Sequence, residues 1–453
     1  MNTSTCTFAS RTLGQGNGLA TSLAGRLNIG LLPCLATCLA LTLLPFTASA
    51  SDVVVHAGLL YDGLTATPRK NVSVVIHDDR IAAIREGFVK PAGATVIDLS
   101  SRTVLPGFID MHVHLGSKLP SRTNATEDWV THSALDRAFD AALFARQMLE
   151  QGFTTVRDLG SSDETVAVRN AIEAGKISGP RLWLSLEALG PTAGHGDPHA
   201  GLDPALSHPG WEYGRVDSAE EARFRVREHK RRGASVIKLM PSGGIASTGD
   251  DPHAQLMTED EVKSAVDTAH MLGMKVAAHA YPPAAIETAV RAGVDSIEHG
   301  SFATAETFAL MKAQGTFLVP TLSVYDVFYK VADEHPELLT PGTAQKELAN
   351  DLLPKRNLPL AVRSGVRIAY GTDLGEGDHL QEFQLLIDNG LSPARALESA
   401  THEAAVLLGA EADVGSLQVG RYADIVAVDG NPLQDAGAFH RTVFVMKGGV
   451  VVR

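Results

Sequence analysis

Eight short apolar runs that alternate with amphipathic helical stretches predict an α/β fold, a (β/α)8 TIM barrel with a small β-sandwich domain formed by both chain ends. Strand–helix alternation implies right-handed crossovers and a parallel sheet. Eight repeats over about 300 residues match this barrel. The runs are 104–112, 154–157, 182–186, 236–239, 276–279, 296–298, 317–321 and 368–370, and helix-like stretches between them include 127–151, 218–232, 258–272 and 343–363.

The two chain ends differ from the middle in their sequence pattern. Residues 53–104 and 414–453 contain short β-rich runs separated by turn signals such as Tyr61-Asp62-Gly63 and Gly448-Gly449. We therefore predict that residues 51–104 and 411–453 form the two parts of the β-sandwich, and that residues 105–410 form the (β/α)8 barrel.

Residues 1–50 are predicted to be a signal peptide. They contain two arginines and no acidic residue, followed by an apolar stretch at 29–46 and a small-x-small site that ends at Ala50. The alternative is an uncleaved membrane anchor, but Pro33 and Pro45 leave an unbroken apolar core that is short for a membrane span. Cleavage near Ala50 predicts a periplasmic or secreted protein with no membrane association afterwards.

Composition excludes several classes of partner and chemistry. All three cysteines lie within the first 50 residues, so a chain that begins at Ser51 has no disulfide and no thiolate ligand. The net charge is −13 and no basic run is present, which argues against nucleic acid or an anionic membrane surface as a partner.

His112-Val113-His114 closes the first predicted barrel strand. Alternate side chains of a strand share a face, so the two imidazoles point into the same small volume and could bind one metal ion. Alone, this pattern is weak evidence for a metal site.

Four further polar residues stand in or just after later strands, namely Lys238, His279, His299 and Asp373. Catalytic groups of such barrels gather at the carboxyl ends of the strands. The six residues together therefore predict a metal centre. Imidazole and carboxylate ligands without thiolate suit zinc, with manganese, cobalt or iron as alternatives.

Each of these residues also has an ordinary structural interpretation. His279 and His299 could be core histidines, and Asp373 could stabilise a turn. Lys238 could pair with a carboxylate, because an uncompensated buried ammonium is costly. The sharper interpretation of Lys238 is a neutral amine that takes up CO2 as a carbamate, an anion able to bridge two metal ions.

These motifs resemble the binuclear metal subgroup of the amidohydrolase superfamily over nearly the whole chain after residue 50. Within it, 192–197 and 279–281 resemble the imidazolonepropionase-related, prolidase-like dipeptidases and the ochratoxin-degrading amidohydrolases. The motifs that carry the wider resemblance are 106–114, Lys238, His279, His299, Asp373, the final barrel helix at 400–405, and the β-sandwich segments 58–63 and 420–426.

The resemblance implies a reaction. It assigns His112, His114 and Asp373 to one divalent ion, and His279 and His299 to the other, with carbamylated Lys238 bridging. A metal-bridging hydroxide then attacks an amide carbonyl, and Asp373 acts first as general base and then as general acid.

The implied substrate is an amide of a C-terminal amino acid: a dipeptide, an N-acyl amino acid or ochratoxin A. Tyr281 is predicted to hold the scissile carbonyl or the product carboxylate, and His195 to act from the loop after the third strand. Their alternatives are packing and loop ordering. Arg157 and Asp158 could form a structural pair and receive no role.

Two other functional classes stay open. One is a cyclic-amide hydrolase or a deaminase of the same superfamily, although mononuclear deaminases need no bridging lysine. The other is a non-catalytic barrel kept as an assembly subunit, which loss of ligands would mark. The resemblance also implies a homo-oligomer.

Overall fold

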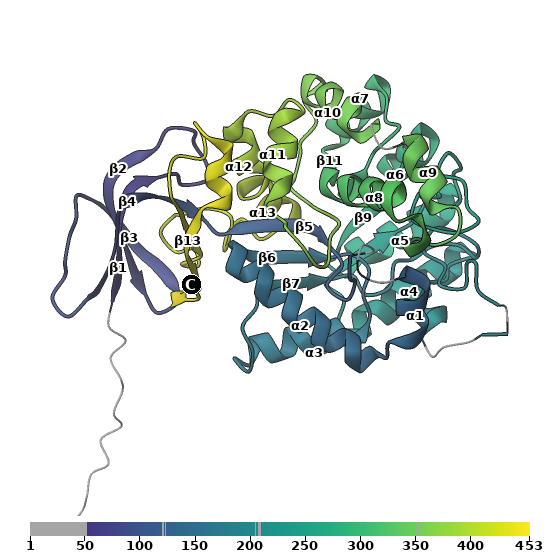
Figure 1. Ribbon diagram of the computed structural model, residues 1–453, viewed down its shortest axis with the longest axis horizontal. Helices are drawn as coiled ribbons and strands as arrows, with labels where there is room; N and C mark the ends of the chain where they lie inside the picture. Colours follow the sequence, from purple (N-terminus) through teal and green to yellow (C-terminus); the bar gives the residue numbers. More distant parts are fainter. Residues whose placement is uncertain (1–51, 120–121, 123, 204, 207–209, 351–352) are drawn as a thin grey trace, which may run out of the picture. The chain divides into compact units, whose positions relative to one another are not determined.

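The computed structural model describes residues 52–453 except 120–121, 123, 204, 207–209 and 351–352 (Figure 1). The predicted signal peptide lies outside the described residues, so its cleavage stays a prediction. In the part of the chain that is described, no helix is long and apolar enough to cross a membrane.

Strands from both chain ends pair into one seven-stranded sheet with the order β14-β13-β12-β4-β1-β2-β3. Only β1 and β4 pair in parallel. The strands are β1 Val53–Leu60, β2 Arg69–His77, β3 Arg80–Glu86, β4 Thr95–Pro106, β12 Ile425–Val428, β13 Thr442–Lys447 and β14 Val450–Val451.

This sheet curls, so that an isolated bridge between Arg80 and Tyr422 joins the β3 edge to the segment before β12. One apolar cluster lies inside the curled sheet. Both chain ends contribute to it, with residues such as Val74 and Ile425. The predicted pairing of the chain ends is thus present. The two facing sheets of a sandwich are not confirmed, because one curled sheet already buries this cluster.

The middle of the chain contains two parallel sheets, with the orders β5-β6-β7 and β11-β10-β9-β8. Seven of the eight predicted runs supply these strands. They are β5 Phe108–Val113, β6 Phe153–Asp158, β7 Arg181–Leu184, β8 Val236–Leu239, β9 Lys275–Ala280, β10 Ser296–His299 and β11 Phe317–Val319. The fold is therefore α/β with parallel sheets.

The eighth predicted run forms no regular strand. Backbone hydrogen bonds nevertheless join Ala369 to Leu318 of β11 on one side, and Tyr370 to Met111 of β5 on the other. An isolated bridge from Leu189 to Leu239 links the remaining two edges. A continuous closed barrel is not confirmed, although the segments stand in the order that the sequence predicts.

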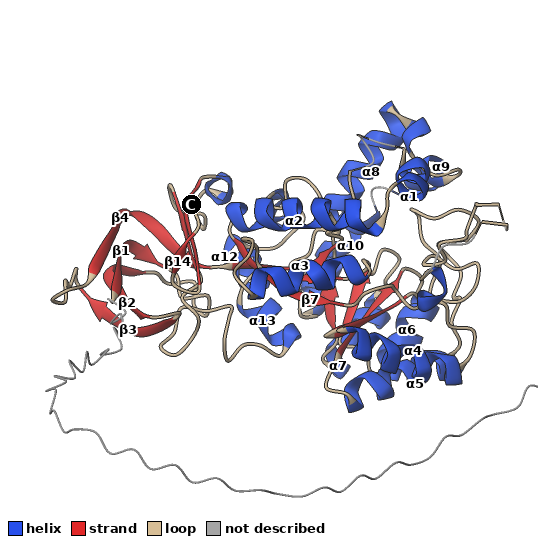
Figure 2. Cartoon of the chain, turned by 90° about the horizontal axis from the view of Figure 1, so that it is seen from below, coloured by secondary structure: helices blue, strands red, loops and turns tan. Residues whose placement is uncertain are grey.

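Helices flank the parallel strands (Figure 2). They are α1 Ala125–Thr131, α2 Ala134–Gln151, α3 Asp163–Glu173, α4 Ala219–Arg232, α5 Glu259–Met271, α6 Pro283–Ala292, α7 Ala305–Gln314, α8 Leu322–Glu334, α9 Thr343–Asn350, α10 Leu353–Ser364, α11 Gln381–Asp388, α12 Pro393–Ser399 and α13 His402–Leu408, with short 3-10 turns η1 Trp211–Gly214, η2 Pro336–Leu338 and η3 Ala436–His440.

Local signals explain where these helices begin and end. The predicted helix 127–151 is divided into α1 and α2, because Ser133 and Asp136 form a capping box that starts a new helix. The predicted stretch 343–363 likewise contains both α9 and α10. Gly152 and Gly233 end α2 and α4 in the left-handed conformation that glycine adopts without strain.

Candidate metal centre

The six predicted ligands meet at the carboxyl ends of the parallel strands. His112 lies near the end of β5 and His114 just beyond it, while Lys238 lies on β8 and His279 on β9. His299 is the last residue of β10, and Asp373 follows the segment that lies between β11 and β5. The parallel strands thus bring residues that are up to about 260 positions apart in the sequence to one edge of the sheets.

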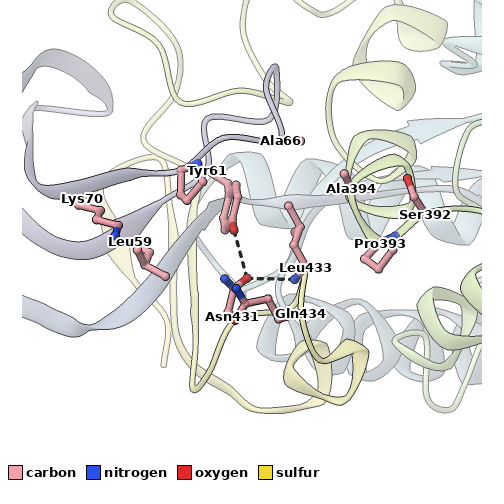
Figure 3. Close-up of a pocket in the computed structure, with 11 residues that line it drawn as sticks. Leu59, Tyr61, Ala66, Lys70, Ser392, Pro393, Ala394, Asn431, Leu433 and Gln434 are labelled. Atoms are coloured by element: carbon pink, nitrogen blue, oxygen red, sulfur yellow. Dashed lines mark hydrogen bonds between the residues drawn. The ribbon is translucent and has the colours of Figure 1, made fainter.

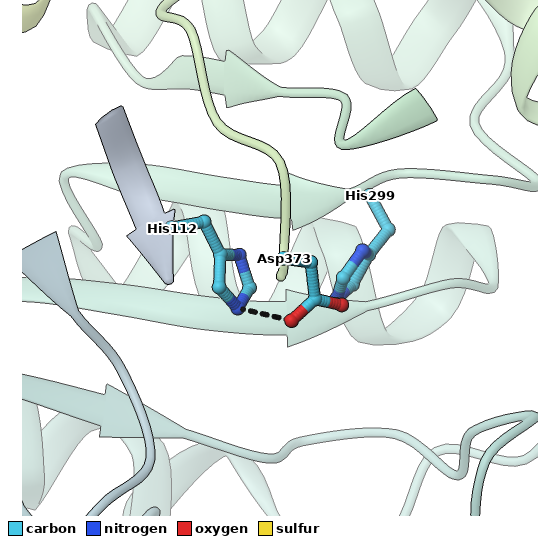
Figure 4. A group of neighbouring side chains, drawn as sticks. All are labelled: His112, His299 and Asp373. Carbon is cyan, nitrogen blue, oxygen red and sulfur yellow. Dashed lines mark ion pairs between the residues drawn. The ribbon is translucent and has the colours of Figure 1, made fainter. Parts of the chain in front are cut away.

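The carboxylate of Asp373 stands at the middle of this group (Figure 4). One of its oxygens lies 2.8 Å from His114 Nε2 and 3.2 Å from His112 Nε2. The other lies 4.0 Å from His299 Nε2. Candidate ligand atoms of His112, His299 and Asp373 all fall within 4.8 Å of one another, which is close enough to share a cation.

Lys238 points into the same group. Its Nζ lies 3.2 Å from His112 Nε2, and only 1% of the residue is exposed. Burial lowers the pKa of this amine to about 8. A neutral amine at neutral pH is therefore far more accessible here than in water, and it is the neutral form that reacts with CO2.

His279 and His299 form the second half of the group, with ring centroids 4.7 Å apart. Their hydrogen bonds show which nitrogens are free. His299 Nδ1 contacts Thr321 Oγ1 at 2.7 Å, which leaves Nε2 available. His279 Nε2 lies 3.2 Å from the Gly243 carbonyl, which can only accept, so Nδ1 of His279 keeps its lone pair.

The protonation states also suit a cation. Burial lowers the pKa of His112 and His279 well below the usual value, and that of His299 to about 3. Burial opposes ionisation of Asp373, but the histidines His112, His114 and His299 together hold its pKa well below the ordinary value. Neutral imidazoles and an ionised carboxylate are the forms that bind a divalent metal. At His114 burial is outweighed by the contact with Asp373, which raises the pKa, so this imidazole would lose a proton on binding a metal.

Two of the candidate ligands have a strained backbone. His299 and Asp373 have φ of 69° and 60°, in the left-handed region that non-glycine residues adopt at a cost of about 1–3 kcal/mol. Such strain persists where the surrounding structure fixes it, and it is concentrated at functional sites. This observation independently favours a site role over the core or turn interpretations of these residues.

His195 and Tyr281 lie against the same group. The His195 ring stacks on His279 at 4.3 Å, and Tyr281 lies 4.5 Å from His279 between ring centroids. Gly244 makes room for His195, since a Cβ at that position would lie 2.2 Å from the imidazole. Tyr281 also bonds to Tyr325, whose hydroxyl lies 2.6 Å from Ser301 Oγ.

A chain of hydrogen bonds orients His195. Ser247 Oγ donates its only hydrogen to Asp250 at 2.5 Å, so it must accept from His195 Nδ1, which lies 2.7 Å away. Lys346 of α9 holds the Asp250 carboxylate at 3.0 Å. His195 Nε2 is therefore the unprotonated nitrogen, and burial lowers the pKa of the ring to about 4.

Sequence analysis does not identify several residues that support these ligands. Thr321, Ser247, Asp250 and Glu298 all contact a site histidine but stand outside recognisable motifs. For Glu298 the sequence did contain an indication of a supporting role. A carboxylate in a strand that is buried on both faces needs a cation or a hydrogen-bond donor nearby.

A shallow cleft of about 690 Å³ lies elsewhere, between the curled sheet and the start of α12 (Figure 3). Tyr61 bonds to Asn431 there at 3.2 Å, and Lys70 is the one ionisable side chain other than Tyr61 on its wall. The cleft has no acid–base pair, so it does not compete with the strand-end group as a reaction site.

Comparison with known proteins agrees with this geometry. The model of a family described as the amidohydrolase family matches residues 103–452. Ochratoxinase of Aspergillus niger is 34% identical over 424 residues, which cover 89% of this chain and 87% of that protein.

Two solved structures extend the comparison to three dimensions. A Xaa-Pro dipeptidase with methionine bound in its active site is 33% identical, with a TM-score of 0.84, and covers 88% of this chain and 99% of its own. A prolidase in complex with N-methylphosphonate-L-proline is 34% identical, with a TM-score of 0.81, and covers 89% of this chain and 100% of its own.

Proposed function

The chain belongs to the amidohydrolase family and is a hydrolase that acts on carbon–nitrogen bonds, and we propose that it removes a C-terminal amino acid from dipeptides and N-acyl amino acids with two bound divalent metal ions. The observation that carries this proposal is the group of His112, His114 and His299 around the ionised Asp373 carboxylate, beside the buried Lys238 amine.

We assign His112, His114 and Asp373 to one ion and His279 and His299 to the other, with Lys238 as a bridging carbamate. Asp373 lies within 3.2 Å of both His112 and His114, which supports the first assignment. Zinc fits these nitrogen and oxygen donors. Two such ions would supply the Lewis acidity that amide hydrolysis needs.

The protein's own groups handle the proton. Asp373 is ionised and stands between the histidines, so it can accept the proton of the attacking water. It can then deliver this proton to the departing nitrogen, without which an amide nitrogen leaves poorly. Tyr281 lies beside His279 and His299, which supports its proposed role of holding the scissile carbonyl or the substrate carboxylate.

The substrate proposal draws on the names of the relatives, ochratoxinase and Xaa-Pro dipeptidase. It predicts that a free α-carboxylate matters more than the acyl group, and ochratoxin A is one candidate substrate. The test compares kcat/KM for an N-acyl amino acid with that for its methyl ester, in the wild type and in Tyr281→Phe. A large loss with the ester supports the proposal.

Equal rates for acid and ester would instead favour the alternative, a cyclic-amide hydrolase or a deaminase. That alternative is tested directly by assaying ring opening of cyclic amides and ammonia release from amino-substituted heterocycles. Detectable turnover only in those assays would replace the C-terminal amidohydrolase proposal.

We also propose that residues 1–50 are removed on export, that the protein acts in the periplasm or outside the cell, and that it forms a homo-oligomer. The two parallel sheets and the segment at 367–374 are proposed to close as a (β/α)8 barrel at 105–410, with 51–104 and 411–453 as the β-domain. N-terminal sequencing of the exported protein should begin near Ser51, and light scattering gives the oligomer size.

A further inference from the structure

The largest fully buried side chain in the part of the chain that is described is Arg157, on β6. The proposed reaction gives it no role. Each of its three guanidinium nitrogens nonetheless donates a hydrogen bond. Nε donates to the Met111 carbonyl at 2.6 Å, Nη1 to Ser296 Oγ at 3.2 Å, and Nη2 to Glu298 Oε1 at 2.9 Å.

Glu298, on β10, is fully buried as well, and its two oxygens face different groups. Oε1 accepts from Arg157 and from Ser296 Oγ, at 2.9 Å and 2.5 Å. Oε2 lies 2.8 Å from His112 Nδ1. Both atoms are buried and neither makes a hydrogen bond of good geometry to any described residue, so their 2.8 Å contact with each other is an ion-pair contact.

We infer that Arg157 and Glu298 are positioning residues of the metal centre, which hold His112 with its hydrogen on Nδ1 and its Nε2 lone pair toward Asp373 and Lys238. This inference rests on the proposed function. A carboxylate that accepts from Arg157 and faces His112 has no hydrogen to donate, so His112 Nδ1 must carry the hydrogen of this contact. Nε2 is then bare, at 3.2 Å from both Asp373 Oδ1 and Lys238 Nζ.

Arg157 acts on His112 in two ways. It fixes the carboxylate that orients the ring, and through the Met111 carbonyl it fixes the backbone immediately before the ligand. A planar guanidinium with a fixed fork of donors can make both contacts at once, which a lysine cannot. Carboxylate contacts of this kind fix the ring orientation and raise the basicity of a metal-binding imidazole.

His114 has no comparable support, although it is a neighbouring ligand. Among the described residues, its Nδ1 makes a single long contact, 3.4 Å to the Gly160 carbonyl. Arg157 and Glu298 therefore orient His112, the ligand closest to Lys238, and do not orient His114.

The experiment measures metal binding by metal-free protein, by competition with a chromophoric zinc chelator and by the visible spectrum of the cobalt form. Two double variants both remove the buried charges. Arg157→Met/Glu298→Gln keeps an oxygen acceptor for His112 Nδ1, whereas Arg157→Met/Glu298→Leu keeps none. The matched control is Arg232→Met/Glu187→Gln, which removes a bidentate pair that touches no ligand.

We expect the leucine variant to lose about 10- to 100-fold in affinity for at least one ion and to have an altered cobalt spectrum. The glutamine variant should retain most of the affinity, and the control all of it. Wild-type affinity for both ions in the leucine variant would overturn the inference.

A measurement on the wild type covers the case in which the leucine variant does not fold. Histidine ¹⁵N spectra of metal-free protein, with His112 assigned through His112→Asn, should show a protonated Nδ1 and a bare Nε2. The opposite tautomer would overturn the inference. Wild-type protein that binds neither ion would overturn the proposed function with it, whereas two ions bound equally by wild type and the leucine variant would overturn this inference alone.

Discussion

Replacement of Lys238 by methionine should stabilise the metal-free protein while it abolishes the two-metal site. Burial lowers the pKa of this amine from 10.5 to about 8. Each pH unit corresponds to about 1.4 kcal/mol, so a protonated Lys238 destabilises the folded chain by about 3 kcal/mol at pH 7. Methionine fills a similar volume without a charge and should recover most of that energy.

The pH dependence follows from the same values. Between pH 8 and 10.5 the unfolded chain binds more protons at this lysine than the folded chain, so the free energy of unfolding rises with pH through this window. From pH 7 to 9.5 the gain from Lys238 should be about 2 kcal/mol. Lys238→Met should lack this gain.

Urea unfolding of chelator-treated wild type and Lys238→Met, at pH 7 and pH 9.5, measures both effects, and elemental analysis after reloading measures the metals. We expect the variant to have the higher urea midpoint at pH 7 and to bind fewer than two ions per chain. A variant that is less stable than wild type at pH 7 would refute the desolvation argument. Two tightly bound ions would refute the bridging role.

Three further outcomes are expected. Asp373→Asn should reduce kcat by about 10²–10⁴-fold, because it removes the group that carries the proton; near-normal turnover in a metal-loaded variant would contradict this role. Ser247→Ala should lower kcat/KM by about five-fold through loss of one hydrogen bond to His195, while Ser247→Thr keeps the hydroxyl and stays close to wild type; equal losses in both would point to packing instead. Metal-free enzyme should regain activity faster with zinc plus bicarbonate than with zinc alone, and the bicarbonate-dependent rate should rise about ten-fold from pH 6 to 7 before it levels above pH 8, since only neutral Lys238 reacts. A rate that is indifferent to bicarbonate would count against the carbamate.

The sequence predicts the fold best where a strand is a continuous apolar run. Seven of the eight predicted runs are strands, because burial on both faces leaves a clear pattern. The run at 368–370 is three residues long and lies between Gly365 and Gly371. Gly371 approaches its neighbours so closely that a Cβ would lie 2.4 Å from Val319. This close contact between Gly371 and β11 arises from the tertiary structure, and the local sequence pattern does not predict it.

The candidate site shows a similar limit. His112, His114, Lys238, His279, His299 and Asp373 lie close together in the structure, while their roles as ligands stay a prediction. The partners that orient them could not be found from strand-end position. Arg157 and Glu298 are 141 positions apart, and Arg157 was left without a role because only its contact across the parallel strands reveals one.

The curled sheet joins the last strands of the chain to the start of β5, the strand that carries His112. β12 pairs with residues 103–106 at the end of β4, and Gly107 donates to the Asp424 carbonyl just before β5 begins. A nascent chain that has not yet reached Ile425 therefore contains all six predicted ligands but lacks the strand that pairs with the end of β4. The start of β5 is held on this side only after the carboxyl-terminal part of the chain has been made.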